Sequence, residues 1–293
     1  MKITTEQLSK KLFSSMTLSE LTKFEIKDEL LTGVNSLDTD FGFPTGYYII
    51  IGNQGVGKSW FALWLSRVFY RNNLVKSVYF SLEMPEPLVR KRILQQWSDL
   101  TKSELESGES TQQAINLLNK DIVLVDEFYE QDTKFRTPEN FKSWVEEYYK
   151  LGYRVFHMDH FHELDGASTN QTNQGVVERW GLAFQQLCKK YPDIWLLVFA
   201  QPKSSDYGKS LLDRNSLRGS KAIIDKCDYV MSLNKSITRD ENGIVIRNED
   251  DGKIMLYLDK TRYTENPNIA FRLQFLPTGN FGSYTKGTNE KLT

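Results

Sequence analysis

Near the start of the chain, a glycine-rich segment stands between a β-prone run and a helical pattern. Residues 52–59 read Gly-Asn-Gln-Gly-Val-Gly-Lys-Ser, a complete G-x-x-x-x-G-K-S. Residues 47–51 before them are apolar and β-prone, and residues 60–70 after them fit a helix. In this order a strand, a glycine-rich turn and a helix form a phosphate-binding loop, because glycines let successive backbone N–H groups curl around a phosphate at the helix N-terminus. The segment therefore predicts a nucleotide-binding α/β domain.

The residue types in this loop indicate which groups bind the nucleotide. We expect Lys58 to reach the β- and γ-phosphates, and the Ser59 hydroxyl to ligate Mg²⁺. The expected ligands are ATP and Mg²⁺. The residues predicted to bind the nucleotide are Gly52, Asn53, Gln54, Gly55, Val56, Gly57, Lys58, Ser59 and Trp60. Further along the helix, Phe61, Trp64 and Phe69 recur at helical spacing and predict core contacts.

Composition limits the classes of protein that fit. The chain has 293 residues, 40% of them hydrophobic and 26% charged, so it can bury a full core. A net charge of −1 excludes a globally basic nucleic-acid coat, and any nucleic-acid contact must come from a local patch. Cys188 and Cys227 lack metal-ligand spacing and are interpreted as core thiols of a reducing compartment. No apolar run is long enough to cross a bilayer, which predicts a soluble, cytoplasmic protein with no membrane contact.

Strand-like and helix-like runs alternate after the phosphate-binding loop. Such alternation predicts an α/β fold with a mostly parallel sheet covered by helices on both faces. The expected strands are residues 77–82, 122–125, 155–158, 194–200, 229–233 and 254–258. Residues 270–275 alternate with a two-residue period and predict an antiparallel edge strand, and residues 240–252 predict a hairpin tip. We expect residues 31–293 to form one domain, and residues 1–30 to form an arm that packs on a neighbouring subunit or stays frayed.

Hydrolysis at such a loop needs a carboxylate near Mg²⁺ and a group that aligns the attacking water. Three carboxylate sites follow predicted strands: Glu83, Asp126 with Glu127, and Asp159. The run Val-Leu-Val-Asp-Glu at residues 123–127 is the more obvious Mg²⁺-side pattern, because apolar residues precede an acidic pair. The residues alone therefore leave Asp126 and Asp159 as alternatives, with Asp126 slightly ahead.

Several segments, in a fixed order along the chain, resemble one family. Phe80-Ser81-Leu82-Glu83-Met84 is similar to a motif of the DnaB-like replicative helicases, a branch of the RecA-type ATPases. The other matching segments are Thr-Gly-Val-Asn-Ser-Leu-Asp at 32–38, Phe-Ala-Gln-Pro at 199–202, Leu-Arg-Gly-Ser-Lys-Ala-Ile at 217–223 and Leu-Asp-Lys-Thr-Arg at 258–262. The resemblance covers roughly residues 32–284. Most of these motifs are weak alone, and their order and spacing carry the resemblance.

The resemblance implies a role for each matching residue. It implies a RecA-like core with antiparallel C-terminal strands, in which Glu83 polarises the attacking water. Asp159, rather than Asp126, would serve Mg²⁺ together with Ser59. Gln201 would sense the γ-phosphate, while Lys260 and Arg262 would reach the nucleotide of a neighbouring subunit. With Lys58, these residues form the expected catalytic set. The residues expected to contact DNA are Lys203, Arg218, Gly219 and Lys221.

The implied activity is that of an ATP-dependent DNA helicase motor in DNA replication. Such a motor translocates on single-stranded DNA as a ring-shaped homo-oligomer, here expected to be a hexamer, and has a primase or a helicase loader as partner. The family's N-terminal primase-contacting domain has no counterpart in this sequence, which is typical of a phage or mobile-element protein acting in the host cytoplasm. Two other functions stay open: a RecA/RadA-type recombinase or recombination mediator, and an ATP-gated loader or switch protein.

The sequence departs from the family's pattern at two of the matching positions. His160-Phe161-His162 follows Asp159 where the family usually has a Tyr-Leu-Gln type of run. Gly219 and Lys221 replace the usual acidic residue and glycine of the DNA-facing loop. The histidines at 157, 160 and 162 surround Asp159, but such spacing along a strand is a loose signal for a metal site. We therefore expect no zinc there.

Overall fold

In the computed structural model of this chain, the described part comprises residues 28–108, 112–118, 120–126, 136–164, 174–207, 209, 211–217, 221–235, 238–239, 245–246, 252–263, 267–283 and 290–291. The predicted arm therefore lies almost entirely outside the described residues. Arg218 and Gly219 lie outside them as well, and the side chain of Lys221 is not described. For these positions the sequence-based expectations stay predictions.

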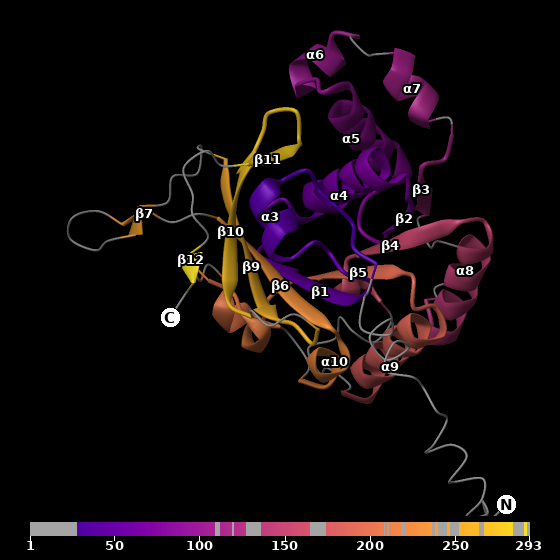
Figure 1. Cartoon of the computed structure of the whole chain (residues 1–293), viewed down its shortest axis with the longest axis vertical. Coiled ribbons are helices and arrows are strands. Elements are labelled where there is room, and N and C mark those ends of the chain that lie inside the picture. The colour runs from indigo at the N-terminus through magenta and orange to yellow at the C-terminus, as the bar shows by residue number, and fades with distance from the viewer. Residues whose placement is uncertain are drawn as a thin grey trace, which may run out of the picture.

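One mixed sheet runs through the molecule, with its strands in the order β11-β10-β9-β6-β1-β5-β4-β2-β3 (Figure 1). The neighbours from β6 to β3 pair in parallel, and β6, β9, β10 and β11 pair in antiparallel fashion. The strands are β1 (Gly46–Gly52), β2 (Lys76–Ser81), β3 (Val123–Asp126), β4 (Tyr153–Asp159), β5 (Trp195–Ala200), β6 (Tyr229–Lys235), β9 (Lys253–Lys260), β10 (Ile269–Phe275) and β11 (Phe281–Ser283). This arrangement confirms the predicted parallel sheet with antiparallel C-terminal strands.

The last part of the sheet differs from the sequence-based expectation in one respect. Residues 270–275 lie in β10 and are antiparallel, as expected, but β10 is not the edge, because β11 pairs along its outer side. A short β12 (Glu290–Lys291) also pairs with β10. The period of two reported the half-buried face of the strand and could not report what lies beyond it. The predicted hairpin tip lies largely outside the described residues, although β7 (Thr238–Arg239) and β8 (Val245–Ile246) before and within it pair in antiparallel fashion.

Helices cover both faces of the sheet. They are α3 (Asn35–Asp40), α4 (Lys58–Asn73), α5 (Glu86–Ser98), α6 (Lys102–Glu106), α7 (Gln112–Leu118), α8 (Pro138–Lys150), α9 (Gln174–Lys190) and α10 (Lys221–Lys226). Tyr48 and Ile50 of β1 belong to the core on the side of α4 and α5, whereas Ile49 and Ile51 belong to the core on the side of α8 and α9. Every residue of β1 is buried for this reason. None of the described helices combines the length and apolar character needed to cross a bilayer.

Helix α4 begins directly at the end of the glycine-rich loop. Gly57 precedes it with a φ of 101°, and its carbonyl accepts the first helical hydrogen bond from the Phe61 N–H at 2.8 Å. The helix runs to Asn73 and stops where Leu74 takes a left-handed conformation with a φ of 58°. Phe61, Trp64 and Phe69 are buried, as their spacing predicted. The buried side of α4 fixes its N-terminus against the sheet and so fixes the loop.

Candidate ATP site

The backbone of residues 52–57 forms the cradle that the glycine pattern predicts. Gly55 and Gly57 have φ values of 74° and 101°, a region that residues with a Cβ rarely adopt. A Cβ at Gly52 would lie 2.8 Å from Val56 Cγ1, so the close packing inside the loop requires glycine there. Next to Gly55 no atom lies within 4 Å of the position a Cβ would take. The loop therefore combines an open outer side with the N-terminus of α4, which fits a phosphate group.

Lys58 lies folded against this loop. Its side chain is buried, and Nζ donates to the carbonyls of Gly52 at 2.8 Å and Asn53 at 3.0 Å. Burial lowers the pKa of the ammonium, while the nearby carboxylates of Asp159 and Glu83 act in the opposite direction. These two carboxylates are thus the acidic groups that Lys58 faces, as a nucleotide site with a Mg²⁺-side aspartate and a water-aligning glutamate requires.

Asp159, at the end of β4, is tied to the loop helix through a tyrosine. The Tyr79 hydroxyl donates to Asp159 Oδ2 and also hydrogen-bonds the Ser59 side chain. Asp159 is only 4% exposed, and Ser59 lies in the first turn of α4, so the two predicted Mg²⁺ ligands share one buried neighbour. The oxygen donors and their common position fit a hard divalent cation. Sequence reasoning missed Tyr79, although a hydroxyl two residues before Ser81 on the α4 side of β2 was the available signal.

Asp126, the alternative Mg²⁺-side residue, lies elsewhere. It ends β3, the outermost parallel strand, and accepts a hydrogen bond of 2.7 Å from the hydroxyl of Tyr148 on α8. This contact with α8 fixes Asp126 on the opposite side of the sheet from α4. The geometry therefore favours Asp159 over Asp126, against the order that the local pattern suggested.

Glu83, His160 and Gln201 meet beside the loop. Glu83 follows β2, and its side chain is 57% exposed, with Oε2 lying 3.6 Å from His160 Nε2. The Gln201 amide, just past the end of β5, lies 2.7 Å from the same ring nitrogen. His162 supports this group, since its Nδ1 accepts from the Gln201 backbone N–H at 3.3 Å. The structure thus brings the predicted water-aligning and sensing residues together through histidines that depart from the family's pattern.

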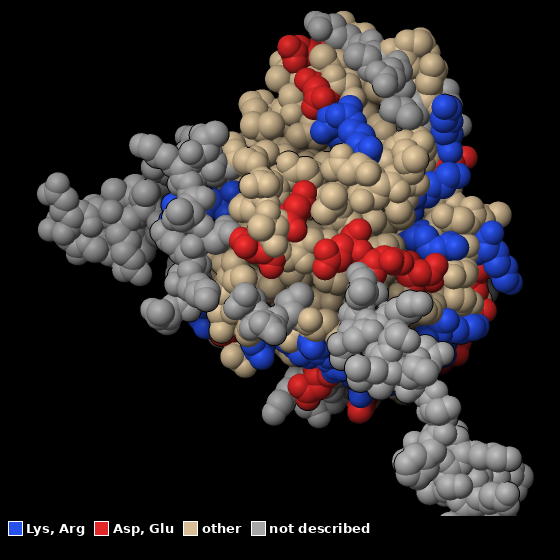
Figure 2. Space-filling view, viewed as in Figure 1, with Lys and Arg blue, Asp and Glu red and all other residues tan. Residues whose placement is uncertain are grey.

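The basic stretch after Gln201 is partly neutralised. Lys203 and Lys209 lie 3.7 Å and 2.9 Å from the carboxylate oxygens of Asp206, whose side chain is buried. Both lysines keep about half of their side-chain surface exposed. On the face shown in Figure 2, acidic side chains gather across the middle and basic ones lie mainly toward the rim. Any DNA contact would therefore come from a local set of cations, in keeping with the net charge of −1.

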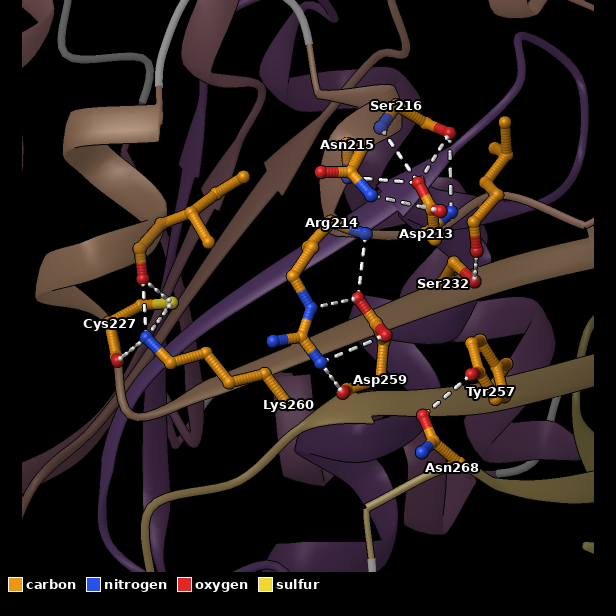
Figure 3. A network of polar contacts seen from close by, with 12 residues as sticks. Asp213, Arg214, Asn215, Ser216, Cys227, Ser232, Tyr257, Asp259, Lys260 and Asn268 are labelled. Carbon is orange, nitrogen blue, oxygen red and sulfur yellow. Dashed lines mark hydrogen bonds and ion pairs between the residues drawn. The ribbon is translucent and has the colours of Figure 1, made fainter. Parts of the chain in front are cut away.

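Lys260 and Arg262 lie far from the loop, at the other edge of the sheet. In the strand register Gly52 is beside Leu233, near the end of β6, whereas Lys260 is beside Val230, near its start. Lys260 Nζ donates to the carbonyls of Ile224 and, at 2.8 Å, Cys227, at the end of helix α10 (Figure 3). The Arg262 guanidinium donates to the Asp225 carbonyl in the same turn. Neither cation can reach the phosphate-binding loop of its own chain without a large rearrangement.

Next to Lys260, Asp259 holds the segment that leads into α10. Its Oδ2 accepts from the Arg214 backbone N–H at 2.7 Å and from Arg214 Nε at 2.9 Å, and Oδ1 accepts from Nη2 at 3.1 Å (Figure 3). These bonds raise the pKa of the Arg214 guanidinium. The end of β9 therefore contacts the chain on both sides of residues 218–220.

Trp60 contributes to packing rather than to the loop surface. Its ring lies 6.1 Å from the ring of Phe275, and the guanidinium of Arg92 lies 5.0 Å from its centroid. A Cβ at Gly279 would overlap the Trp60 ring, at 2.2 Å from the nearest atom. The indole is therefore held by the turn between β10 and β11, which leaves only the Trp60 backbone for the predicted contact with a nucleotide.

The remaining histidine and the cysteines have structural surroundings. His157 is fully buried, its Nε2 lies 2.9 Å from the Ser66 hydroxyl of α4, and burial lowers its pKa to about 3. Burial raises the pKa of the Cys227 thiol to about 12. Cys188 and Cys227 form no disulfide. Within the part of the chain that the structure describes, no group of His, Cys, Asp and Glu has the arrangement of a protein-only metal site.

With this geometry in place, the comparisons with known proteins agree on one family. The family model described as the DnaB-like helicase C terminal domain matches residues 29–278. A solved structure whose title describes an ATPase domain is similar at a TM-score of 0.70 and 14% identity, with 97% of this chain and 100% of that chain covered. The structure of a DnaB-like replicative helicase and its interactions with primase gives a TM-score of 0.73 at 15% identity, over 95% of this chain and 70% of that one.

More distant structures share the fold as well. The RadB recombinase has a TM-score of 0.57 and 13% identity over 87% of this chain and 99% of that chain. No curated protein sequence matches the chain. The match to the family model spans most of the chain and includes the loop, the parallel strands and the antiparallel strands β9 and β10. The chain belongs to the family of DnaB-like helicase C-terminal domains.

Proposed function

We propose that this chain is an ATP-driven motor that moves along single-stranded DNA as a ring of identical subunits and separates DNA strands. One observation carries the proposal: the groups that hydrolysis requires lie at one edge of the sheet, while the two predicted trans-acting cations lie at the other. A nucleotide at the first edge is completed by Lys260 and Arg262 only if they come from a second copy of the chain. A ring of like subunits satisfies this requirement at every site.

The residues at the loop edge divide the work of ATP hydrolysis. Backbone N–H groups of the loop and the Lys58 ammonium hold the β- and γ-phosphates. Ser59 and Asp159 would hold Mg²⁺, which neutralises charge on the phosphate oxygens when it is bound. Glu83 aligns the attacking water, since its exposed carboxylate lies beside the loop and near the Lys58 ammonium. Gln201 lies next to Glu83 through His160 and so can report on the γ-phosphate.

The DNA-contacting surface of the proposed motor follows Gln201 in the chain. Lys203 and the predicted Arg218, Gly219 and Lys221 would contact phosphates along one strand, which requires cations and backbone groups rather than base-specific edges. The segment between them is fixed to the sheet, because Leu217 pairs with Pro202 and Arg214 binds Asp259. A fixed segment of this kind can carry a change at Gln201 toward the DNA.

The decisive experiment is unwinding of a labelled forked DNA duplex with ATP and Mg²⁺, with Glu83→Gln as the matched variant. We expect ATP-dependent strand separation by the unaltered chain and none by the variant, which keeps the shape of the side chain but loses its charge. DNA-stimulated hydrolysis without unwinding, together with pairing of homologous strands, would instead establish a recombinase, whose fold the RadB structure shares. Slow hydrolysis that DNA does not stimulate would favour an ATP-gated switch.

A further inference from the structure

We propose that His160 is a positioning residue that couples the γ-phosphate sensor Gln201 to the water-aligning Glu83. The inference rests on the proposed ATPase function and adds a residue that the family's pattern does not supply, since the chain has a histidine where a tyrosine is usual. Its basis is geometric: one ring nitrogen of a buried histidine lies between the two side chains.

The contacts of His160 place both partners on the same atom. Nε2 is 2.7 Å from the Gln201 amide nitrogen and 3.6 Å from Glu83 Oε2. The first is a hydrogen bond, and the second is longer than a hydrogen bond. His160 is only 3% exposed and has a second neighbour in His162, whose ring lies 5.9 Å away and perpendicular to it. The ring therefore has little freedom to turn toward other partners.

Because a ring nitrogen makes one hydrogen bond, Gln201 and Glu83 compete for Nε2. In this structure Gln201 holds it: the amide N–H donates to Nε2, so the ring hydrogen is on Nδ1. Among the described residues Nδ1 finds no hydrogen-bond partner. A buried donor without a partner is costly, so the state with Gln201 on His160 is one that a competing arrangement can replace.

The competing arrangement arises when Gln201 turns toward a phosphate oxygen. Nε2 is then released, the single ring hydrogen is on Nε2 instead of Nδ1, and Nε2 donates to Glu83 Oε2. The net charge of the ring does not change. Glu83 Oε2 is fixed in this way, and Oε1 is left to align the attacking water. His160 thus makes the orientation of Glu83 depend on whether Gln201 has found its phosphate.

The contacts of Gln201 extend this coupling to the chain surface. Its amide oxygen accepts a 3.0 Å hydrogen bond from the hydroxyl of Tyr207, whose side chain is half exposed in the segment that carries Lys203 and Lys209. When the Gln201 amide turns away, Tyr207 loses this partner. A change at the nucleotide therefore reaches both Glu83 and the basic stretch through the same amide group.

The test measures steady-state ATP hydrolysis by the full-length chain with His160→Leu and His160→Gln. We expect His160→Leu to lower kcat about 10- to 100-fold, as loss of a supporting hydrogen-bond partner does, with KM within about threefold. In His160→Gln the amide supplies a donor for Glu83 and an acceptor for Gln201, so kcat should return to within about threefold of the unaltered chain. Adding Gln201→Ala to His160→Leu should cost little more, because both act through one contact.

Controls separate positioning from a general loss of structure. His157→Gln changes another buried histidine, which contacts Ser66 and neither Glu83 nor Gln201, and should leave kcat within about twofold. Binding of a fluorescent ATP analogue should be unchanged in His160→Leu. An unchanged kcat in His160→Leu, or equal losses in both His160 variants with weakened nucleotide binding, would overturn the inference. If Glu83→Gln hydrolyses ATP as fast as the unaltered chain, the proposed function fails instead.

Discussion

The ion pair between Asp259 and Arg214 gives a quantitative test of how the end of β9 is held. The Asp259 side chain is 8% exposed and the Arg214 side chain 42% exposed, and the carboxylate accepts hydrogen bonds from the backbone N–H, Nε and Nη2 of Arg214. In Asp259→Asn the amide oxygen still accepts from the backbone N–H. The amide NH₂ group, however, then faces the guanidinium, and the charge that paired with it is gone.

The expected loss follows from burial. Breaking a fully buried pair costs about 3–5 kcal/mol of folding free energy. Since solvent reaches two fifths of the Arg214 side chain, we reduce this figure to about 2 kcal/mol. For a domain of this size, that loss lowers the melting temperature by about 4–8 °C.

The matched control is Asp193→Asn, which alters a pair of the same chemistry at the surface. Asp193 lies 2.9 Å from Arg154 Nε, but the side chains are 39% and 30% exposed, so the expected cost is about 0–1 kcal/mol. Thermal unfolding of both variants and the unaltered chain, in low and high salt, measures the difference. We expect the larger shift of Asp259→Asn to persist in high salt, because a buried pair is screened less. Equal shifts for the two variants would refute the assignment of stability to burial.

Two further predictions concern stability. His157 stays neutral when folded because burial lowers its pKa to about 3, so the unfolded chain binds the proton first as pH falls, and stability present at pH 7 is lost on acidification; between pH 7 and pH 5 this costs about 2 kcal/mol, which denaturant titrations of His157→Gln should show to be absent. Gly279→Ala should cost about 2 kcal/mol or more, since it combines a φ of 79° with overlap on Trp60, whereas Gly152→Ala, with a φ of 91° and open space, should cost about 1 kcal/mol; equal melting temperatures would contradict the role of the Trp60 contact.

The sequence was sufficient to predict the sheet and the phosphate-binding loop, because both depend on local patterns. Apolar runs and a glycine-rich turn are properties of neighbouring residues, and β1, the loop and α4 follow them closely. The end of the sheet was predicted less well, because whether β10 is an edge depends on a later segment that pairs with it. A period of two reports which side chains are buried, and the number of strands beyond is a matter of tertiary structure.

The contacts that organise the site could not be predicted from local pattern, because they join residues distant in sequence. Tyr79 reaches Asp159 across 80 positions, and the Gln201 amide reaches His160 across 41. Pattern even favoured Asp126 over Asp159, since an acidic pair after four apolar residues is the stronger local signal. What separates the two carboxylates is the side of the sheet on which each finds its tyrosine, and only the fold determines that.

In the proposed ring, the end of β9 connects the neighbour's nucleotide with the DNA-contacting segment of its own chain. Asp259 holds Arg214 on one side of residues 218–220, and Lys260 holds the end of α10 on the other. Lys260 Nζ cannot keep its bonds to the carbonyls of Ile224 and Cys227 and also reach a neighbour's phosphate, because both carbonyls hold it against its own chain and its three donors must point toward them. Engagement of the neighbour's nucleotide therefore requires that α10 lose this contact, while Arg214 stays fixed. Residues 218–220 join these two points and belong to the segment that the sequence assigns to DNA, so the movement is directed to the residues that would use it.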